Sequence, residues 1–531
     1  QLAQYAAATP ERVRAAMQKW LTRPMHALVV EPGPRGAYEE SKSVPRPATF
    51  KPAFYRQPDA PHATFAPAAA VDRSKLPEVG TIPDLKFPAV SRARLSNGIE
   101  IVYAQRMATP TTRVVVSFDA GNAADPADRL GLESLTLSLL DEGTKTRNST
   151  QIAEEQERLG ATIGMSTSTD RTNVSLFALS PNLKPSVALL ADILRNPVFA
   201  PAEVERLRNQ QLVAIQSELT QPSGLAQRTL PPILFGPAHP YGRPTSGNGD
   251  PAIVSKLTRG DLVAFQQAWI RPDKATIFVV SDQPLDKVRS VLDAALGDWR
   301  GTGAPGVKAF TAAVPQPQPR IVLVDRPDSP QSLIYGGVLT PLKGRDELIP
   351  YLAANDVLGG NFLSRLNMDL RETRGWSYGV NGNFRRMLEA VPYFVSAPVQ
   401  ADRTGESLVA MREDMQTFLT SQGITPPEAE RTINGFVREL PGSFETAADV
   451  LGGMQNNVLY GRPDNYYDTV ASRYRALTAT AMDRAIRSAL DPSKITWVVV
   501  GDAKLVKPQL DRLGLPVEVK MAPQQTAVGA K

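Results

Sequence analysis

Apolar residues follow two different periods along this chain, and each period predicts one kind of element. From Leu132 to Leu139, leucines recur at helical spacing and share one face, which predicts an amphipathic helix. Segments 95–104 and 111–121 are instead rich in β-branched residues and end in Asn/Gly turns, as strands do. Strands followed by helices that cover one face indicate an α+β fold.

Some helix ends can also be placed from the sequence. Asn148 or Ser149 is a good N-cap for the helix that follows it, and Gly160 is placed to end that helix. Two longer helices are predicted near residues 185–195 and 201–220. This order of strands, helices, strands and long helices describes one α/β sandwich domain.

The chain repeats this order with a period of about 220 residues, which is too long for a solenoid. The motif Tyr-Gly-Arg-Pro occurs at 241–244 and again at 460–463, and each copy is followed by a Leu-Thr pair. In both copies 14 residues separate that Thr from a Pro, and 24 residues separate it from an Asp that ends an apolar run. Segments 92–300 and 320–515 are therefore predicted to be two homologous α/β sandwich domains. Residues 1–33 repeat the order of helix, Pro and apolar strand, which predicts the C-terminal end of a preceding homologous domain.

Three regions lack this patterning. Residues 34–91 are rich in proline and are predicted to be a linker. A shorter linker is predicted at 301–319, and residues 516–531 are predicted to be a tail that frays.

The composition excludes several kinds of chemistry. The 531 residues carry a net charge of +5 without a basic cluster, so no nucleic-acid partner is indicated. The absence of cysteine excludes disulfides, thiolate zinc sites and cysteine nucleophiles. Only His26, His62 and His239 are available to a histidine-based site. No run of 18 apolar residues occurs, so no transmembrane segment is expected.

One short motif, at residues 375–379, matches the G-x-S-x-G pattern of serine hydrolases. That pattern needs a strand before the serine and a triad histidine later in the chain. Here a helical pattern precedes the motif and no histidine follows His239, so we do not interpret it as catalytic.

The segment GLESLTLSLLDEGT at 131–144 resembles the part of the pitrilysin/insulinase-type zinc metallopeptidases that carries their inverted H-x-x-E-H motif. In that family the two histidines and a later glutamate bind zinc, and the glutamate of the motif activates water. The resemblance places Ser134 and Ser138 at the histidine positions, Leu137 at the glutamate position and Ala214 at the later ligand. None of these side chains can replace its counterpart. The chain alone is therefore predicted to be inactive and to bind no metal.

A second stretch, 358–379, is similar to the part of the same family that supplies an Arg and a Tyr seven residues apart. Arg371 and Tyr378 match that pair, and Arg374 is a nearby alternative for the Arg. In the family these side chains bind the substrate, where they donate hydrogen bonds to the peptide carbonyl and to the oxyanion that forms from it. Substrate binding by Arg371 and Tyr378 is what the resemblance implies.

The resemblance implies a mitochondrial-processing-peptidase-like fold and a role as the non-catalytic half of a zinc metalloendopeptidase. The chain would form the closed chamber and orient peptide substrates for a zinc-bearing partner, either an N-terminal half or a separate catalytic subunit. Zinc is expected in that partner half, and a periplasmic or otherwise extracytoplasmic location is expected. Two alternatives remain: a structural module like the core subunits of respiratory complexes, and a peptide-binding chamber without proteolysis.

Overall fold

The computed structural model describes residues 2–29, 80 and 82–523, which belong to two compact units, 1–79 and 80–531. The first unit contains α1 (Leu2–Ala6) and α2 (Pro10–Leu21). Thr9 caps α2, because its hydroxyl accepts a hydrogen bond from the backbone N–H of Arg12 at 3.3 Å.

The apolar strand predicted near the end of segment 1–33 is not found at residues 24–29. A strand is stabilised by hydrogen bonds to a neighbouring strand, and the first unit has no strand among its described residues. Residues 30–33 and most of the predicted linker 34–91 lie outside the described part of the chain.

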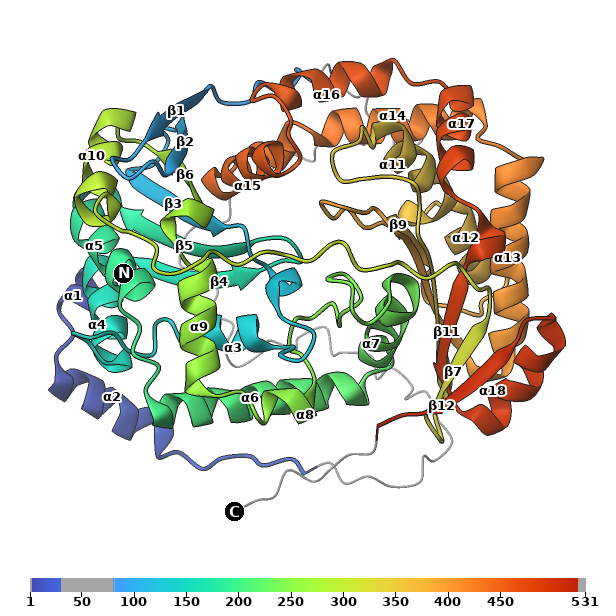
Figure 1. The fold of residues 1–531 in the computed structure, drawn as a ribbon, viewed down its shortest axis with the longest axis horizontal. Coiled ribbons are helices and arrows are strands. Elements are labelled where there is room, and N and C mark those ends of the chain that lie inside the picture. The colour runs from blue at the N-terminus through green and yellow to red at the C-terminus, as the bar shows by residue number, and fades with distance from the viewer. Residues whose placement is uncertain (1, 30–79, 81, 524–531) are drawn as a thin grey trace, which may run out of the picture. The chain divides into compact units, whose positions relative to one another are not determined.

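The second unit contains two six-stranded mixed sheets (Figure 1). In the first sheet β2 and β6 are parallel, and all other neighbours are antiparallel. In spatial order its strands are β1 (Val90–Arg94), β2 (Glu100–Gln105), β6 (Ala275–Ser281), β3 (Thr111–Phe118), β5 (Thr172–Leu179) and β4 (Thr162–Thr167).

In the second sheet β7 is parallel to both of its neighbours, and the remaining pairs are antiparallel. Its strands, again in spatial order, are β12 (Val517–Met521), β7 (Ile321–Asp325), β11 (Thr496–Gly501), β8 (Gln331–Val338), β10 (Tyr393–Gln400) and β9 (Asn381–Phe384).

Five strands occupy equivalent places in the two sheets, since β2-β6-β3-β5-β4 in the first corresponds to β7-β11-β8-β10-β9 in the second. The sixth strand differs. In the first sheet it is β1, which comes before β2 and is antiparallel to it, whereas in the second it is β12, which comes last and is parallel to β7. The segment 516–531, predicted to be a tail, therefore contributes a strand, and its residues 524–531 lie outside the described part.

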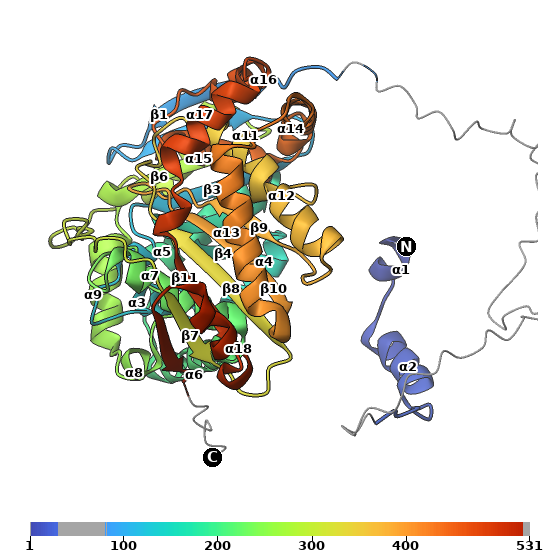
Figure 2. The same ribbon diagram turned by 90° about the vertical axis from the view of Figure 1, so that its right-hand side faces the viewer.

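Helices pack on one face of each sheet, and the predicted α+β class with two α/β sandwiches is confirmed. Figure 2 shows α13 in front of the second sheet. In the first half the helices are α3 (Leu132–Ser138), α4 (Ser149–Leu159), α5 (Leu183–Arg195), α6 (Pro201–Thr220), α7 (Pro222–Phe235), α8 (Pro251–Val254), α9 (Arg259–Trp269) and α10 (Leu285–Leu296). In the second half they are α11 (Ile349–Asn355), α12 (Arg365–Asn367), α13 (Thr404–Thr420), α14 (Pro426–Glu439), α15 (Ala447–Leu459), α16 (Tyr466–Arg475), α17 (Ala479–Ala489) and α18 (Ala503–Leu510).

The other face of each sheet is covered by a helix from the opposite half. On β7, Ile321 and Leu323 face the helices of their own half, whereas Val322 and Val324 face α7. Reciprocally, α15 covers the face of the first sheet that carries Phe278 (Figure 1). This exchange explains why the central strands are continuous apolar runs, because both of their faces are buried.

The predicted linker 301–319 lies against the fold. Lys308 donates hydrogen bonds to the carbonyl oxygens of Ala120 and Asp170, at 3.2 and 2.9 Å. Phe310 packs against the aromatic ring of Tyr241 with a centroid distance of 5.0 Å. The segment therefore joins the two halves as part of their interface.

Candidate functional site

Helix α3 carries the two positions that the resemblance assigned to zinc-binding histidines, and the position of the glutamate between them. It follows Gly131, which has a φ of +93°, and a Cβ there would lie 2.6 Å from the carbonyl oxygen of Asn248. The carboxylate of Asp125 accepts hydrogen bonds from the backbone N–H groups of Gly131 and Glu133, both at 2.7 Å. These contacts fix the start of α3.

The side chains at the four ligand and base positions are engaged elsewhere or lack donor atoms. Ser134 donates a hydrogen bond to the carbonyl oxygen of Gly247 at 2.9 Å, and Ser138 donates one within its own helix. Leu137 is only 5% exposed, and Ala214 is an exposed methyl group on α6. These residues do not fit a zinc ion, which requires imidazole, thiolate or carboxylate ligands.

In the described part of the chain, no three His, Cys, Asp or Glu residues are grouped so that they could hold a metal ion. His239 is buried beside the aromatic residues of the interface, and its Nδ1 accepts a hydrogen bond from the backbone N–H of Tyr241 at 3.0 Å. Its role in this structure is therefore to fix that turn. That the chain binds no zinc remains a prediction.

Glu133, next to Ser134 on α3, is completely buried, which the sequence did not indicate. Thr167 donates a hydrogen bond to its carboxyl group at 2.6 Å, and Thr172 donates another. Burial raises the pKa of Glu133 to about 8, and the nearby charge of Asp125 acts in the same direction. The carboxyl group that remains beside the former motif is therefore mostly neutral near pH 7 and faces inward.

Arg371 and Tyr378 lie on one continuous segment of the second half. Arg371 belongs to a π-helical stretch (Met368–Thr373) that continues α12, and Tyr378 lies in the loop before β9. The side chain of Tyr378 is 81% exposed and makes no hydrogen bond to the described residues. The two side chains form no hydrogen bond with each other, so the structure presents them separately to solvent.

The loop around Tyr378 is fixed on both sides. Ser377 donates a hydrogen bond to the carbonyl oxygen of Pro398 at 2.7 Å and accepts one from the backbone N–H of Gly379 at 3.1 Å. The backbone N–H of Trp376 donates to the carbonyl oxygen of Leu370 at 2.9 Å. Tyr378 therefore projects from a backbone whose position is determined by its neighbours.

The structure distinguishes Arg371 from the nearby Arg374. Arg374 donates a hydrogen bond to Asp369 at 2.6 Å, and its guanidinium group lies 4.8 Å from the ring centre of Trp376. Arg371 forms a longer ion pair, with Glu372 at 3.2 Å, and lies 4.6 Å from the ring centre of Phe362. Arg371 is thus the less engaged of the two, although both are similarly exposed.

Exposed apolar side chains occur on the same segment as this pair. Phe362, Leu363 and Met368 are exposed, which is uncommon for large apolar residues that lie close together in sequence. An apolar surface with a cation and a phenol can contact the side chains of a peptide while the two polar groups bind its backbone.

Two supporting contacts were not foreseen from the sequence. The buried Asn367 donates to the carbonyl oxygen of Phe362 at 2.6 Å and accepts from the backbone N–H of Val380 at 3.0 Å, so it joins both ends of the segment. Arg365 forms a two-pronged ion pair with Glu428 of α14, at 2.9 and 2.8 Å. The Ser-Arg-Leu triplet that resembles the family marks Arg365 in the sequence. Its partner Glu428 could not be recognised, because it lies 63 residues further along the chain.

Comparisons with known proteins give the family of the chain. Residues 100–242 match the model of the insulinase family (peptidase family M16), and residues 256–436 match that of the peptidase M16 inactive domain. A relative described as a non-peptidase homolog, from Helicobacter pylori, is 21% identical over 430 residues, which is 80% of this chain and 97% of that protein.

Solved structures show the same fold. A peptidase M16 inactive domain from Pseudomonas fluorescens superposes with a TM-score of 0.71 at 23% identity and covers 78% of this chain and 98% of its own. The periplasmic protease PqqL from Escherichia coli superposes with a TM-score of 0.68 at 15% identity. That match covers 94% of this chain and 51% of PqqL.

Within the described residues, no helix has both the length and the apolar character needed to span a bilayer. The two family models match consecutive parts of the chain, and the four positions on α3 and α6 all lie in the part that matches the insulinase model. This chain belongs to the insulinase (M16) family of peptidases, of which it is a member without the zinc-binding motif.

Proposed function

We propose that this chain is the non-catalytic half of an M16 zinc metalloendopeptidase, and that it binds and orients the peptide that a zinc-bearing partner half cleaves. The main supporting observation is that Tyr378 projects from an anchored loop into solvent, on the same segment as the partly exposed Arg371. Its partner is an N-terminal half of the same polypeptide or a separate catalytic subunit. Segments 92–300 and 320–515 are the two peptidase-like domains of this half.

The chemistry of the pair follows from its donors. The phenol of Tyr378 and the guanidinium group of Arg371 both donate hydrogen bonds to a peptide carbonyl oxygen, and these strengthen as negative charge develops on that oxygen. Zinc, held by the partner half, supplies the activated water. The chain's own contribution is to bind the peptide backbone and to stabilise the oxyanion.

Helix α2 supports the proposal that residues 1–33 end a preceding homologous domain. Like α9 and α17, it is capped by a Thr. In α9 and α17 the residues 4, 7 or 8, and 11 positions after that Thr are buried, whereas in α2 they are exposed. These residues are Leu262, Phe265 and Trp269 in α9, Met482, Ile486 and Ala489 in α17, and Val13, Met17 and Trp20 in α2.

A periplasmic or otherwise extracytoplasmic location is part of the proposal. The similarity in fold to a periplasmic protease supports it. Fractionation of cells of the source organism, with detection of this chain, tests it directly.

The proposed function is tested by cleavage of a quenched peptide by the peptidase reconstituted with its zinc-bearing half. We expect Tyr378→Phe to lower kcat about 10²–10³-fold, the usual effect of losing one oxyanion donor. The melting temperature should not change, because Tyr378 is exposed and makes no hydrogen bond in the described part of the chain. Arg371→Ala should lower kcat and raise KM, since a guanidinium group also binds the ground-state peptide.

Arg374→Ala is the matched control, because Arg374 is as exposed as Arg371 but is held by Asp369. It should change cleavage little. Wild-type kcat in Tyr378→Phe would refute the proposed role. For the isolated chain, metal analysis should find no stoichiometric zinc, and one tightly bound Zn²⁺ that is lost on Ser138→Ala would contradict this.

A structural module, or a peptide-binding chamber without proteolysis, is the second candidate. The relative described as a non-peptidase homolog favours it. Co-purification of this chain from its source distinguishes the two, because a partner with an intact H-x-x-E-H helix supports the peptidase half, and a membrane complex supports the structural module.

A further inference from the structure

A cavity of about 550 Å³ lies where the two halves meet, and none of the residues that line it belongs to the segment 358–379. Strands of the first sheet form one wall, with Ser117 and Arg171, and α15 of the second half forms the opposite wall. Arg345 and Tyr460 of the second half complete its lining. The cavity is therefore separate from the Arg371–Tyr378 segment.

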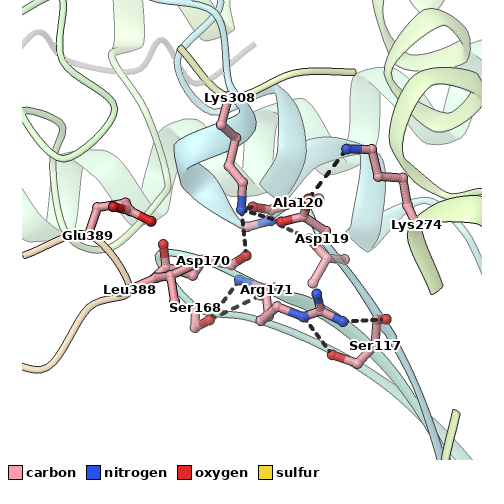
Figure 3. Close-up of polar contacts among 12 residues, drawn as sticks. Ser117, Asp119, Ala120, Ser168, Asp170, Arg171, Lys274, Lys308, Leu388 and Glu389 are labelled. Atoms are coloured by element: carbon pink, nitrogen blue, oxygen red, sulfur yellow. Dashed lines mark hydrogen bonds and ion pairs between the residues drawn. The ribbon is translucent and has the colours of Figure 1, made fainter. Parts of the chain in front are cut away.

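Arg171 lines this cavity and is held by hydrogen bonds to Ser117 (Figure 3). Its Nε donates to the hydroxyl of Ser117 at 3.1 Å, and its Nη2 donates to the Ser117 carbonyl oxygen at 2.8 Å. Its Nη1 makes no hydrogen bond to the described residues, so the N–H groups on one edge of the guanidinium group are available to a ligand. Burial lowers the pKa of Arg171, yet a guanidinium group remains charged in proteins. A second cation, Arg345, is exposed at the cavity and forms no ion pair with the described residues.

Two carboxylates lie near Arg171, and both have other partners. Asp119 is the one carboxylate in the lining, and it is paired with Lys308 at 2.7 Å and with Lys274 at 3.3 Å (Figure 3). The neighbouring Asp170 accepts hydrogen bonds from the hydroxyl of Tyr241 and the backbone N–H of Leu388, at 2.6 and 2.9 Å. The cavity therefore has an excess of positive charge and a fixed cationic donor.

The remaining lining suits a peptide end. Asn173 and Gln455 are hydrogen-bonded to each other at 3.1 Å, and with Asn456 they offer amide groups that match those of a peptide backbone. Phe278 and Leu459 supply an apolar wall for a side chain. A guanidinium group binds a carboxylate through two parallel hydrogen bonds better than it binds a neutral group.

We propose that this cavity binds a carboxylate, presented by the C-terminal end of a peptide, with Arg171 and Arg345 as the groups that bind it. The same chemistry occurs in small organic acids, so the test must separate the two sources. The Arg371–Tyr378 pair can also contact a peptide, and for this reason the test must use variants that alter the cavity alone.

Gly452 provides such a variant. It lies in α15 and lines the cavity, and a Cβ at this position would meet no atom within 4 Å. Gly452→Leu should therefore fill the cavity without a clash, and it should favour the helix. Gly435→Leu is the matched control, because Gly435 lies in α14, has equally open surroundings and does not line the cavity.

The experiment is titration calorimetry of the full chain with an N-acetylated apolar tripeptide, with the same peptide as its C-terminal amide, and with succinate. We expect the free-carboxylate peptide to bind at least 10-fold more tightly than the amide and than succinate. Arg345→Gln should weaken binding about 10- to 100-fold, the effect of losing a charge-assisted hydrogen bond. Gly452→Leu should abolish binding, and Gly435→Leu should leave it unchanged.

Equal affinity of the amide would overturn the proposal, as would wild-type binding to Gly452→Leu. Tight binding of succinate together with weak binding of the peptide would overturn the peptide source and assign the cavity to a small organic acid. Arg345→Gln and Gly452→Leu test the proposal even if an Arg171→Gln variant does not fold. Arg345 is exposed and Gly452 is surrounded by open space, so neither substitution should prevent folding.

Discussion

Glu133 is a buried carboxyl group on α3 whose pKa is raised by its surroundings. It precedes Ser134, and its carboxyl group faces the interior between two threonine hydroxyls. Burial raises its pKa to about 8, from an ordinary value of 4.5 in the unfolded chain. Between those values the folded protein keeps a proton that the unfolded chain releases, so the free energy of unfolding falls as pH rises.

We therefore expect Glu133→Gln, which resembles the neutral form, to be more stable than the wild type at pH 8.5 and similar to it at pH 5. Urea unfolding between pH 5 and 9 measures this difference. Glu154→Gln is the control, because Glu154 is exposed on α4 and should leave the pH dependence unchanged. A wild-type stability that does not fall over this range would show that Glu133 is ionised in the folded protein.

Residues at the positions of a known motif could be identified from the sequence. Residues whose role depends on contacts made only in the folded chain could not. Ser134 and Leu137 could be placed because a motif gives their positions, and the structure shows their side chains to be unsuited to zinc. Asn367 could not be predicted, because its two partners are backbone groups of residues 362 and 380, and no spacing marks them.

At the scale of elements, caps and apolar faces predicted helices well. The helix after Asn148 was placed by its cap and by Gly160, and α4 spans Ser149–Leu159 with a capping box at Asn148. The π-helical turn Met368–Thr373 was not foreseen, because a single π-helical turn that continues an α-helix is too short to leave an apolar period of its own. Arg371 lies in that turn, and the preceding helix α12 is held to α14 by the pair between Arg365 and Glu428.

The Arg365–Glu428 pair should stabilise this arrangement at neutral pH. Burial opposes ionisation of Glu428, yet hydrogen bonds from Arg365 and Thr425 outweigh it and lower the pKa of Glu428 to about 2. The stabilisation is thus present above about pH 4.5 and is lost as pH falls toward 2. We expect Glu428→Gln to cost about 1–2 kcal/mol at pH 7, after allowance for partial exposure of the pair, and nothing at pH 2.

Urea unfolding at several pH values measures this cost, and peptide cleavage by the reconstituted enzyme reports whether Arg371 moves. Glu430→Gln on the same helix is the control, since Glu430 is exposed and forms no ion pair with the described residues. A constant difference between Glu428→Gln and the wild type from pH 2 to 7 would contradict an electrostatic origin.

At the scale of the whole second unit, the sequence predicted two repeats but not how they combine. Continuous apolar strands such as Ile321–Asp325 indicate burial on both faces, yet their pattern does not say which helix covers them. The structure shows that α7 and α15 are exchanged between the halves. The sixth strand of the second sheet, β12, was not predicted either. It is short and mostly exposed, so its sequence has no apolar pattern.

This exchange should make the two halves unfold together. Without α7, the second sheet would expose Val322 and Val498, and without α15 the first sheet would expose Val102 and Phe278. Each half thus needs the other to bury an apolar sheet face, which is the main source of folding free energy. Calorimetry of residues 80–531 should show one transition, with equal van't Hoff and calorimetric enthalpies.

Leu230→Ala tests the same coupling from a single site. Leu230 is fully buried on α7 against the sheet of the opposite half, so its truncation should cost about 2–5 kcal/mol. If the halves are coupled, hydrogen exchange of the slowest amides should accelerate equally in both sheets. Faster exchange confined to one sheet, or two separate calorimetric transitions, would mean that each half is stable alone and that the interface joins two independently folded domains.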